Sequence, residues 1–180
     1  MIRLHLTSEA FEQDIRPLYM SFFPKEDYVF SYGGKPVKSA SGTGGGDVTA
    51  DWGRYLLEGD WREDGFTLSL YRGGDLNIAV KREEMQVPFA ERKKFRDEVK
   101  RAVYRMLSAE TGKELPWGTL TGVRPVKQVL ERLEAGEAAE SIDTFLKEEY
   151  YCFDEDAQKM MPIISKNNLF CYLVDTTKFE

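Results

Sequence analysis

Phe66-Thr67-Leu68-Ser69-Leu70 is the stretch of sequence that decides the fold. Its apolar and small polar side chains alternate with period two, which is typical of a β-strand with one buried face. Similar runs flank it, Tyr55-Leu56-Leu57-Glu58 before and Leu76-Asn77-Ile78-Ala79-Val80 after. The connections at 60–65 and 73–75 are short and contain Gly and Asp, so we predict an antiparallel meander of three strands.

Two amphipathic segments can cover the apolar face of this sheet. An apolar stripe at helical spacing runs from Phe11 to Phe22 behind Thr7-Ser8-Glu9, which suit a helix start, and we expect Pro17 to kink or restart this helix. A second stripe from Phe95 to Met106 ends at Thr111-Gly112, where glycine fits the left-handed cap. The expected fold class is therefore α+β, a small antiparallel sheet with helices packed on one face. Two shorter runs, 2–6 and 28–32, are predicted as further strands.

The sequence after residue 112 predicts a helical C-terminal extension. Pro125 suits the first turn of a helix that continues to Leu133 and closes at Ala135-Gly136. Residues 141–150 and 154–168 are predicted as two further helices, and the apolar run 170–174 as either a strand or a segment that needs a partner. We therefore expect an α+β accessory domain over 1–112, with a flexible Gly- and Ser-rich loop over 35–50, and a helical linker over 113–180.

Charge and cysteine usage narrow the function classes. The net charge of -6 argues against nucleic-acid binding, including binding of RNA through the sheet, because phosphate neutralisation requires a basic face. Cys152 and Cys171 are the two cysteines and offer no disulfide framework. No run approaches about 18 apolar residues, so we expect a cytoplasmic protein with no membrane contact.

The charge is unevenly distributed. Residues 81–105 contain nine basic and five acidic residues, whereas residues 131–156 contain ten acidic and two basic ones. These stretches can pair inside the fold, or the acidic helices can face a partner protein, but solvated helix faces are the simplest interpretation.

Catalytic and metal-ligating motifs are missing from the sequence. With one histidine and two distant cysteines, it offers no set of ligands for zinc or for an iron–sulfur cluster, so we predict no catalytic residue, no metal and no cofactor in this chain. His5 is predicted to be structural and Cys152 to be a packed thiol. The glycine-rich run 41–46 lacks the Gly-Lys-[Ser/Thr] ending of a phosphate-binding loop.

One segment has a composition that packing alone does not demand: Leu115-Pro116-Trp117-Gly118-Thr119-Leu120-Thr121-Gly122-Val123-Arg124-Pro125-Val126-Lys127. Free amides at the start of the following helix, with two cations nearby, can hold an anion or a partner's carboxylate. The candidate docking or anion site comprises Trp117, Thr121, Arg124 and Lys127. In the competing interpretation Trp117 fills a core, and the glycines and prolines fix a sharp turn between the two halves.

This segment resembles the stretch before the catalytic domain in oxygen-independent coproporphyrinogen III oxidase-like proteins, of the coproporphyrinogen dehydrogenase branch of radical S-adenosylmethionine (SAM) enzymes. The resemblance extends to Arg16-Pro17-Leu18, Ser31-Tyr32-Gly33-Gly34 and Leu146-Lys147-Glu148-Glu149-Tyr150, although only 117–127 is specific. It implies a parent oxidoreductase of haem biosynthesis that converts porphyrin propionates to vinyl groups. It also implies a 4Fe–4S cluster and SAM in that parent.

None of the family's cluster-binding cysteines, in the pattern Cys-x-x-x-Cys-x-x-Cys, is present here. We therefore expect a non-catalytic N-terminal accessory domain, either an excised piece or a natural truncation, whose partner is the catalytic domain of the same protein. A porphyrinogen would be met only through that parent. The alternative is a stand-alone protein-interaction module that uses the acidic helices.

Overall fold

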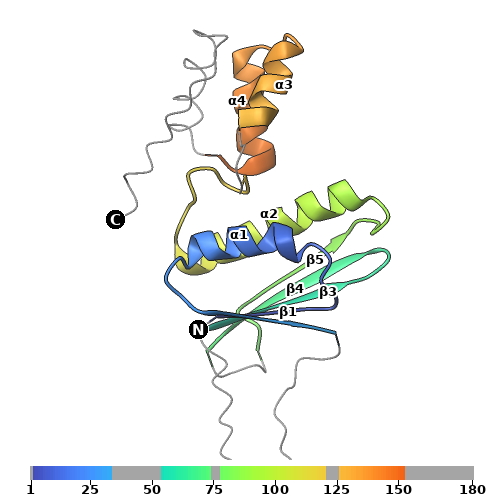
Figure 1. Cartoon of the computed structure of the whole chain (residues 1–180), viewed down its shortest axis with the longest axis vertical. Helices are drawn as coiled ribbons and strands as arrows, with labels where there is room; N and C mark the ends of the chain where they lie inside the picture. Colours follow the sequence, from blue (N-terminus) through green and yellow to red (C-terminus); the bar gives the residue numbers. More distant parts are fainter. Residues whose placement is uncertain (1, 34–53, 74–77, 121–125, 153–180) are drawn as a thin grey trace, which may run out of the picture. The chain divides into compact units, whose positions relative to one another are not determined.

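The computed structural model describes residues 2–33, 54–73, 78–120 and 126–152, and divides the chain into two compact units, unit 1 (1–115) and unit 2 (116–180). Unit 1 is a sheet covered by two helices, and the described part of unit 2 holds a pair of helices (Figure 1). The elements in chain order are β1 (Ile2–Leu6), α1 (Glu12–Phe22), β2 (Tyr28–Tyr32), β3 (Tyr55–Trp61), β4 (Gly65–Arg72), β5 (Lys81–Gln86), α2 (Arg92–Thr111), α3 (Val126–Glu134) and α4 (Ala139–Tyr150).

The five strands form one mixed sheet in the order β2-β1-β3-β4-β5. Strands β3, β4 and β5 form the expected antiparallel meander, but β1 lies parallel to both β2 and β3. The α+β class with helices on one face is confirmed, whereas the expectation of a purely antiparallel sheet is wrong. The chain leaves β1, passes through α1 and returns to the same end of the sheet, and a helical crossover of this kind makes neighbouring strands parallel.

The last strand begins five residues later than the alternation predicts. β5 spans 81–86, whereas residues 78–80, the described part of the predicted run 76–80, lie in the connection before it, where Ile78 is 73% exposed. β5 is an edge strand, and Glu83 on its helix side forms an ion pair with Arg105 of α2. An edge strand can carry charges without losing its pairing, so apolar alternation was a poor guide here.

The core of unit 1 lies between the sheet and the two helices, which run side by side over one of its faces (Figure 1). Phe95 of α2 is fully buried at its centre, with its ring 5.1 Å from that of Phe11 and 5.3 Å from that of Phe66. Trp61 and Phe89 complete the aromatic cluster. Burial of each such side chain contributes about 1.5–3 kcal/mol, so this cluster is a main source of stability.

Helix α1 differs from the prediction at its start and at Pro17. It begins at Glu12, three residues after the expected signal, and Phe11 precedes it with a left-handed φ of 64°. Burial of the Phe11 ring offsets the about 1–2 kcal/mol that this conformation costs. The helix is continuous through Pro17, so the proline does not restart it. The interior proline costs about 3 kcal/mol, which burial of Leu18 and Phe22 can offset.

Unit 2 confirms two of the predicted helices, α3 and α4, and Gly136 in the connection between them has a φ of 79°. Val129, Ile142, Leu146 and Cys152 are buried between these helices, so the packed thiol is confirmed for Cys152. The expected loop 35–50, helix 154–168 and apolar run 170–174 lie outside the described residues. Among the described residues, no helix has the length and apolar character needed to cross a membrane.

Candidate functional site

The segment predicted as a docking turn begins in unit 2 as a turn bonded to the C-terminal end of α4. Thr119 donates its backbone N–H to the carbonyl of Tyr150 (2.7 Å), and the thiol of Cys152 lies 3.5 Å from the carbonyl oxygen of Trp117. Gly118 between them has a φ of 54°, and a Cβ there would overlap the Tyr150 carbonyl. Only glycine therefore permits this close approach of the turn to α4.

The four predicted site residues have different outcomes. Trp117 is half-buried and packs against the core of unit 2, which favours its structural interpretation. Thr121 and Arg124 lie outside the described residues, and Lys127 falls in α3 with a side chain that the structure does not describe. The anion or docking role of this segment stays a prediction.

A row of polar side chains crosses the sheet on the face away from the helices. The register pairs His5 with Ser31 on one side and with Glu58 on the other, and Glu58 with Ser69. His5 is buried, and its Nδ1 lies 2.8 Å from the Ser31 hydroxyl. Residues that are paired across neighbouring strands point to the same face of the sheet. Because side chains alternate along each strand, these polar residues lie on the face opposite the buried apolar side chains.

Tyr71 of β4 lies next to this row and donates its hydroxyl to Glu58 (3.1 Å). Burial raises the pKa of Tyr71, and the charge of Glu58 and this hydrogen bond raise it further. The hydroxyl is therefore protonated at neutral pH and serves as a hydrogen-bond donor, which makes it a poor general base.

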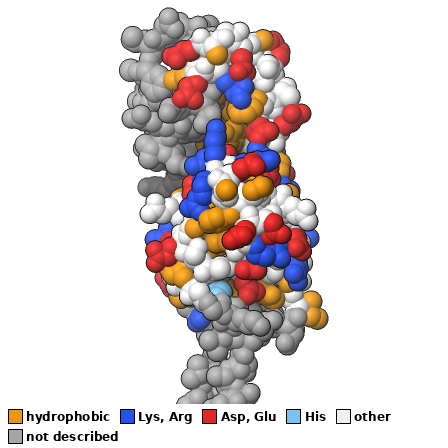
Figure 2. All heavy atoms as spheres, turned by 90° about the vertical axis from the view of Figure 1, so that its right-hand side faces the viewer, with side chains coloured by type: hydrophobic (Ala, Val, Ile, Leu, Met, Phe, Trp, Pro, Cys, Tyr) orange, Lys and Arg blue, Asp and Glu red, His pale blue; other side chains and the backbone are white. Residues whose placement is uncertain are grey.

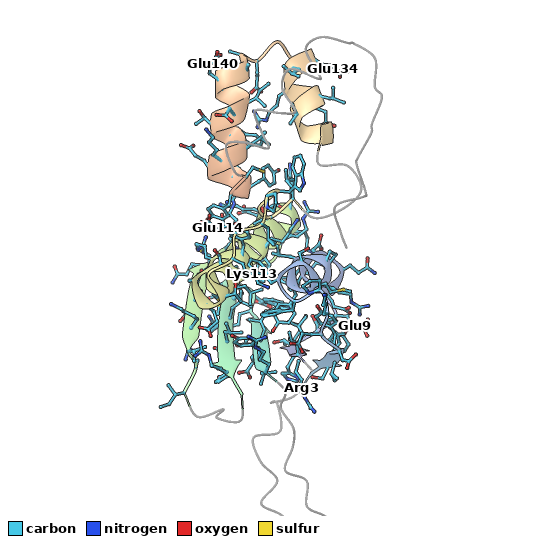
Figure 3. The ribbon with its side chains drawn as sticks, turned by 90° about the vertical axis from the view of Figure 1, so that its left-hand side faces the viewer. Arg3, Glu9, Lys113, Glu114, Glu134 and Glu140 are labelled. Atoms are coloured by element: carbon cyan, nitrogen blue, oxygen red, sulfur yellow. The ribbon has the colours of Figure 1, made fainter. Side chains whose placement is uncertain are left out.

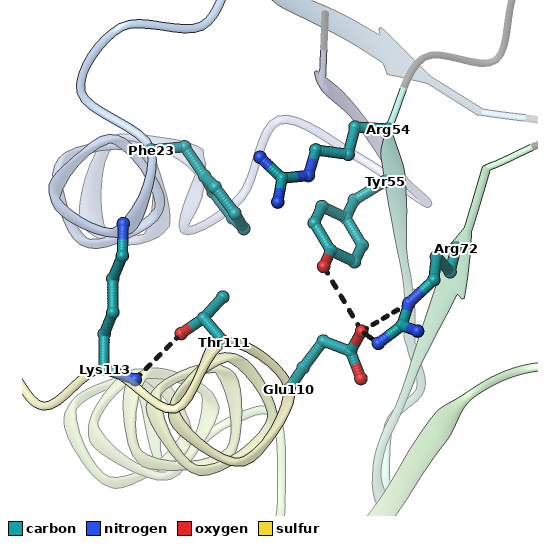
Figure 4. Close-up of a pocket in the computed structure, with 7 residues that line it drawn as sticks. All are labelled: Phe23, Arg54, Tyr55, Arg72, Glu110, Thr111 and Lys113. Atoms are coloured by element: carbon teal, nitrogen blue, oxygen red, sulfur yellow. Dashed lines mark hydrogen bonds and ion pairs between the residues drawn. The ribbon is translucent and has the colours of Figure 1, made fainter.

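Unit 1 also has a pocket of about 420 Å³ at the end of the sheet where β3 begins and β4 ends. It is lined by Phe23, Arg54, Tyr55, Arg72, Glu110, Thr111 and Lys113 (Figure 4). These residues come from the C-terminal ends of α1 and α2 and from the two strand ends. The volume lies in the range of small-molecule sites.

Glu110 organises one wall of the pocket. Its side chain is 7% exposed, and its Oε1 accepts hydrogen bonds from Arg72 Nε (2.7 Å) and from the Tyr55 hydroxyl (3.2 Å). This hydrogen bonding raises the pKa of Arg72 above its usual value. Arg72 is thereby held at the rim with its charge largely in solvent (Figure 4).

This pocket could not be predicted from the sequence, because its charged residues are scattered among unrelated segments. Arg54 precedes β3 and Arg72 ends β4, and Glu110 and Lys113 flank the glycine cap of α2. No motif spacing joins them, since only the pairing of β3 with β4 and the packing of α2 bring them together.

The structure describes the basic stretch 81–105 in unit 1 and part of the acidic stretch 131–156 in unit 2. Acidic and basic side chains are interspersed on the face seen in Figure 2. Arg101 and Arg105 of α2 pair with Glu98 and Glu83 of their own unit. In unit 2, Glu134 and Glu140 lie on either side of the connection between α3 and α4 (Figure 3). These ion pairs within unit 1 favour the interpretation of α2 as a helix with an ordinary solvated charged face.

Comparison with known proteins gives one weak similarity. The chain is 36% identical over 61 residues to the oxygen-independent coproporphyrinogen-III oxidase-like protein HemZ of Bacillus subtilis (strain 168). The match covers 34% of this chain and 12% of HemZ, so it supports a distant relationship at most. No family model and no solved structure matches the chain.

Proposed function

We propose that this 180-residue chain forms a non-catalytic accessory domain of a coproporphyrinogen oxidase-like radical-SAM oxidoreductase of porphyrin biosynthesis. The observation that carries the proposal is the 36% identity over 61 residues with HemZ. Because the match covers 12% of HemZ, most of that protein has no counterpart in the aligned stretch. The activity in the name of HemZ therefore comes to this chain only as part of the proposal.

The ligand chemistry of the chain supports an accessory role. A radical-SAM cluster requires three thiolates at close spacing, and the sequence contains two cysteines 19 positions apart, Cys152 and Cys171. Among the described residues, no group of three His, Cys, Asp or Glu side chains could hold a metal ion. In the proposed arrangement the 4Fe–4S cluster, SAM and the porphyrinogen all belong to a catalytic domain of the same protein, which is also the docking partner.

The first test is to sequence the gene on both sides of these codons. The proposal predicts that the same reading frame encodes a Cys-x-x-x-Cys-x-x-Cys motif. A complete frame without that motif would overturn the proposal and leave the stand-alone interaction module, with its acidic helices, as the explanation to pursue.

The second test concerns Arg124, which we propose docks on the catalytic domain through a two-point contact with a carboxylate. Arg124→Ala should lower the turnover of the whole enzyme while it leaves the melting temperature of the 180-residue chain unchanged. Lys94→Ala removes an exposed cation from α2 and is the matched control, with normal turnover expected. If Arg124→Ala unfolds the chain but leaves the activity per folded molecule normal, the arginine is structural.

A further inference from the structure

The pocket at the end of β3 and β4 is lined by more positive than negative charge. Three cations, Arg54, Arg72 and Lys113, surround one carboxylate, Glu110. Glu26 approaches Arg54 from outside the lining, at 3.7 Å, and even with this carboxylate the cations are in excess by three to two. A concave site with uncompensated positive charge attracts anions.

Two of the three cations form hydrogen bonds that stabilise the fold of unit 1. Arg72 is bonded to the nearly buried Glu110. The ammonium of Lys113 donates to the carbonyl of Phe22 (3.1 Å), at the C-terminal end of α1, where a cation offsets the negative end of the helix dipole. Lys113 retains two further N–H donors, and Arg72 exposes most of its side chain.

Arg54 makes the loosest contacts of the three cations. Its side chain is 65% exposed, and its contact with the Glu26 carboxylate, at 3.7 Å, is longer than a charge-assisted hydrogen bond. Its guanidinium lies 5.6 Å from the centre of the Tyr55 ring and faces the opening of the pocket (Figure 4). It is therefore held at the opening with most of its donors available to a ligand.

The remaining walls of the pocket suit the apolar part of a small molecule. Phe23 and Tyr55 line it with their rings 5.2 Å apart, and the Phe23 ring points towards the same opening as Arg54 (Figure 4). Aromatic rings beside a guanidinium suit a ligand that has a planar apolar part and an anionic group. The rings contact the planar part, and the guanidinium binds the anionic group.

We propose that this pocket binds a small organic anion, whose carboxylate or phosphate group pairs with Arg54 and Arg72 while its body lies against Phe23 and Tyr55. The guanidinium of Arg54 matches the paired oxygens of both anions as a planar fork, whereas Arg72, whose Nε and Nη2 bond Glu110, contributes its charge and its Nη1 donors. The proposal is independent of the accessory role, because it depends only on residues of unit 1.

The test is a titration of the ¹⁵N-labelled 180-residue chain, followed by amide shifts at constant ionic strength. Benzoate, phenyl phosphate, inorganic phosphate and the neutral benzamide are the probes. We expect saturable shifts at the lining residues with both ring-bearing anions, weaker binding of inorganic phosphate and none of benzamide. The tighter of benzoate and phenyl phosphate identifies the anionic group.

Arg54→Gln should weaken the binding of the better anion about fivefold, which is the scale of one exposed ion pair. Arg54→Lys should recover part of the loss. Lys94→Gln makes the same change of net charge near the other end of the 20-residue helix α2, roughly 25 Å away, and should leave binding unchanged.

Three results would overturn the proposal. Shifts that rise linearly without saturation would show non-specific screening, and equal effects of Arg54→Gln and Lys94→Gln would show a response to net charge alone. Benzamide binding as tightly as benzoate would show that the charge is not recognised. Since neither variant removes a buried contact, the folded amide spectrum should persist in each of them.

Discussion

The buried core of unit 1 and the buried cluster in the described part of unit 2 are filled by different side chains. Unit 1 buries aromatic rings around Phe95 beneath two helices, whereas the buried cluster in the described part of unit 2 is made of four small or aliphatic side chains. Unit 2 instead depends on close backbone contact, where Gly118 lets a turn bond to the end of α4. We therefore expect burial of aromatic rings to dominate the stability of unit 1, and close backbone contact to contribute a larger share in the described part of unit 2.

The largest expected effect is in the aromatic core. Phe95→Ala removes a fully buried ring that contacts four others, and should lower the free energy of unfolding of unit 1 by about 3–5 kcal/mol. Urea unfolding followed by tryptophan fluorescence measures this loss. Ile78→Ala, at a position that is 73% exposed, is the control and should change the midpoint little. Equal losses in both variants would contradict the assignment of the core.

The next effect tests the backbone contact in unit 2. Gly118→Ala adds a Cβ at a φ of 54° and against the Tyr150 carbonyl, so it should cost about 3 kcal/mol and open α4. Gly136→Ala is the matched control, because Gly136 has a φ of 79° but nothing within 4 Å of a Cβ, and it should cost only about 1 kcal/mol. Hydrogen exchange of α4 amides measures both. If the two variants exchange alike, the contact with Tyr150 contributes nothing.

Trp117→Ala separates side-chain from backbone contributions in the same turn. The ring is half-buried against the core of unit 2, so its loss should cost about 2–3 kcal/mol, less than a fully buried tryptophan. The same exchange measurement on α4 applies. A cost above that of Gly118→Ala would mean that side-chain burial, rather than backbone fit, dominates unit 2.

The smallest effect at neutral pH is expected at Tyr19 in unit 1. Burial raises the pKa of Tyr19 well above its usual value, with smaller contributions from Tyr28 and Tyr55, and its hydroxyl has no hydrogen-bond partner among the described residues. Tyr19→Phe should therefore change stability at pH 7 by no more than about 1 kcal/mol, in the stabilising direction.

The alkaline range sharpens this prediction. The phenol of Tyr19 ionises near its ordinary pKa in the unfolded chain but stays protonated in the folded chain. Ionisation of Tyr19 therefore does not affect the free energy of unfolding below about pH 10. Above that pH the free energy of unfolding falls, by up to about 1.4 kcal/mol per pH unit. In Tyr19→Phe the free energy of unfolding should fall less steeply with pH above about pH 10. Tyr32→Phe, at a more exposed phenol, should leave most of this decrease in place. An unchanged alkaline slope in Tyr19→Phe would contradict the role of burial.

Sequence reasoning succeeded where periodicity reports burial directly. The alternation at 66–70 and the stripe at 95–106 correspond to β4 and α2, and Gly112 has the left-handed φ expected of a cap. It failed at β5, because an edge strand tolerates charges, and at β1, because parallel and antiparallel strands share one alternation. For the candidate site, a glycine-dependent turn was predicted, but the contact of Gly118 with the end of α4 and the pocket around Arg54 were not.

The sequence by itself determined most of the helices and strands that the structure describes, and which of their faces are apolar, since both follow from local preference and spacing. It also determined that this chain lacks the thiolates of an iron–sulfur cluster. Only the tertiary structure decided that β1 lies between β2 and β3, and that Arg54, Arg72 and Glu110 meet at one end of the sheet. Those placements depend on strand pairing and helix packing between segments that are separated along the chain, which leave no periodic signal in the sequence.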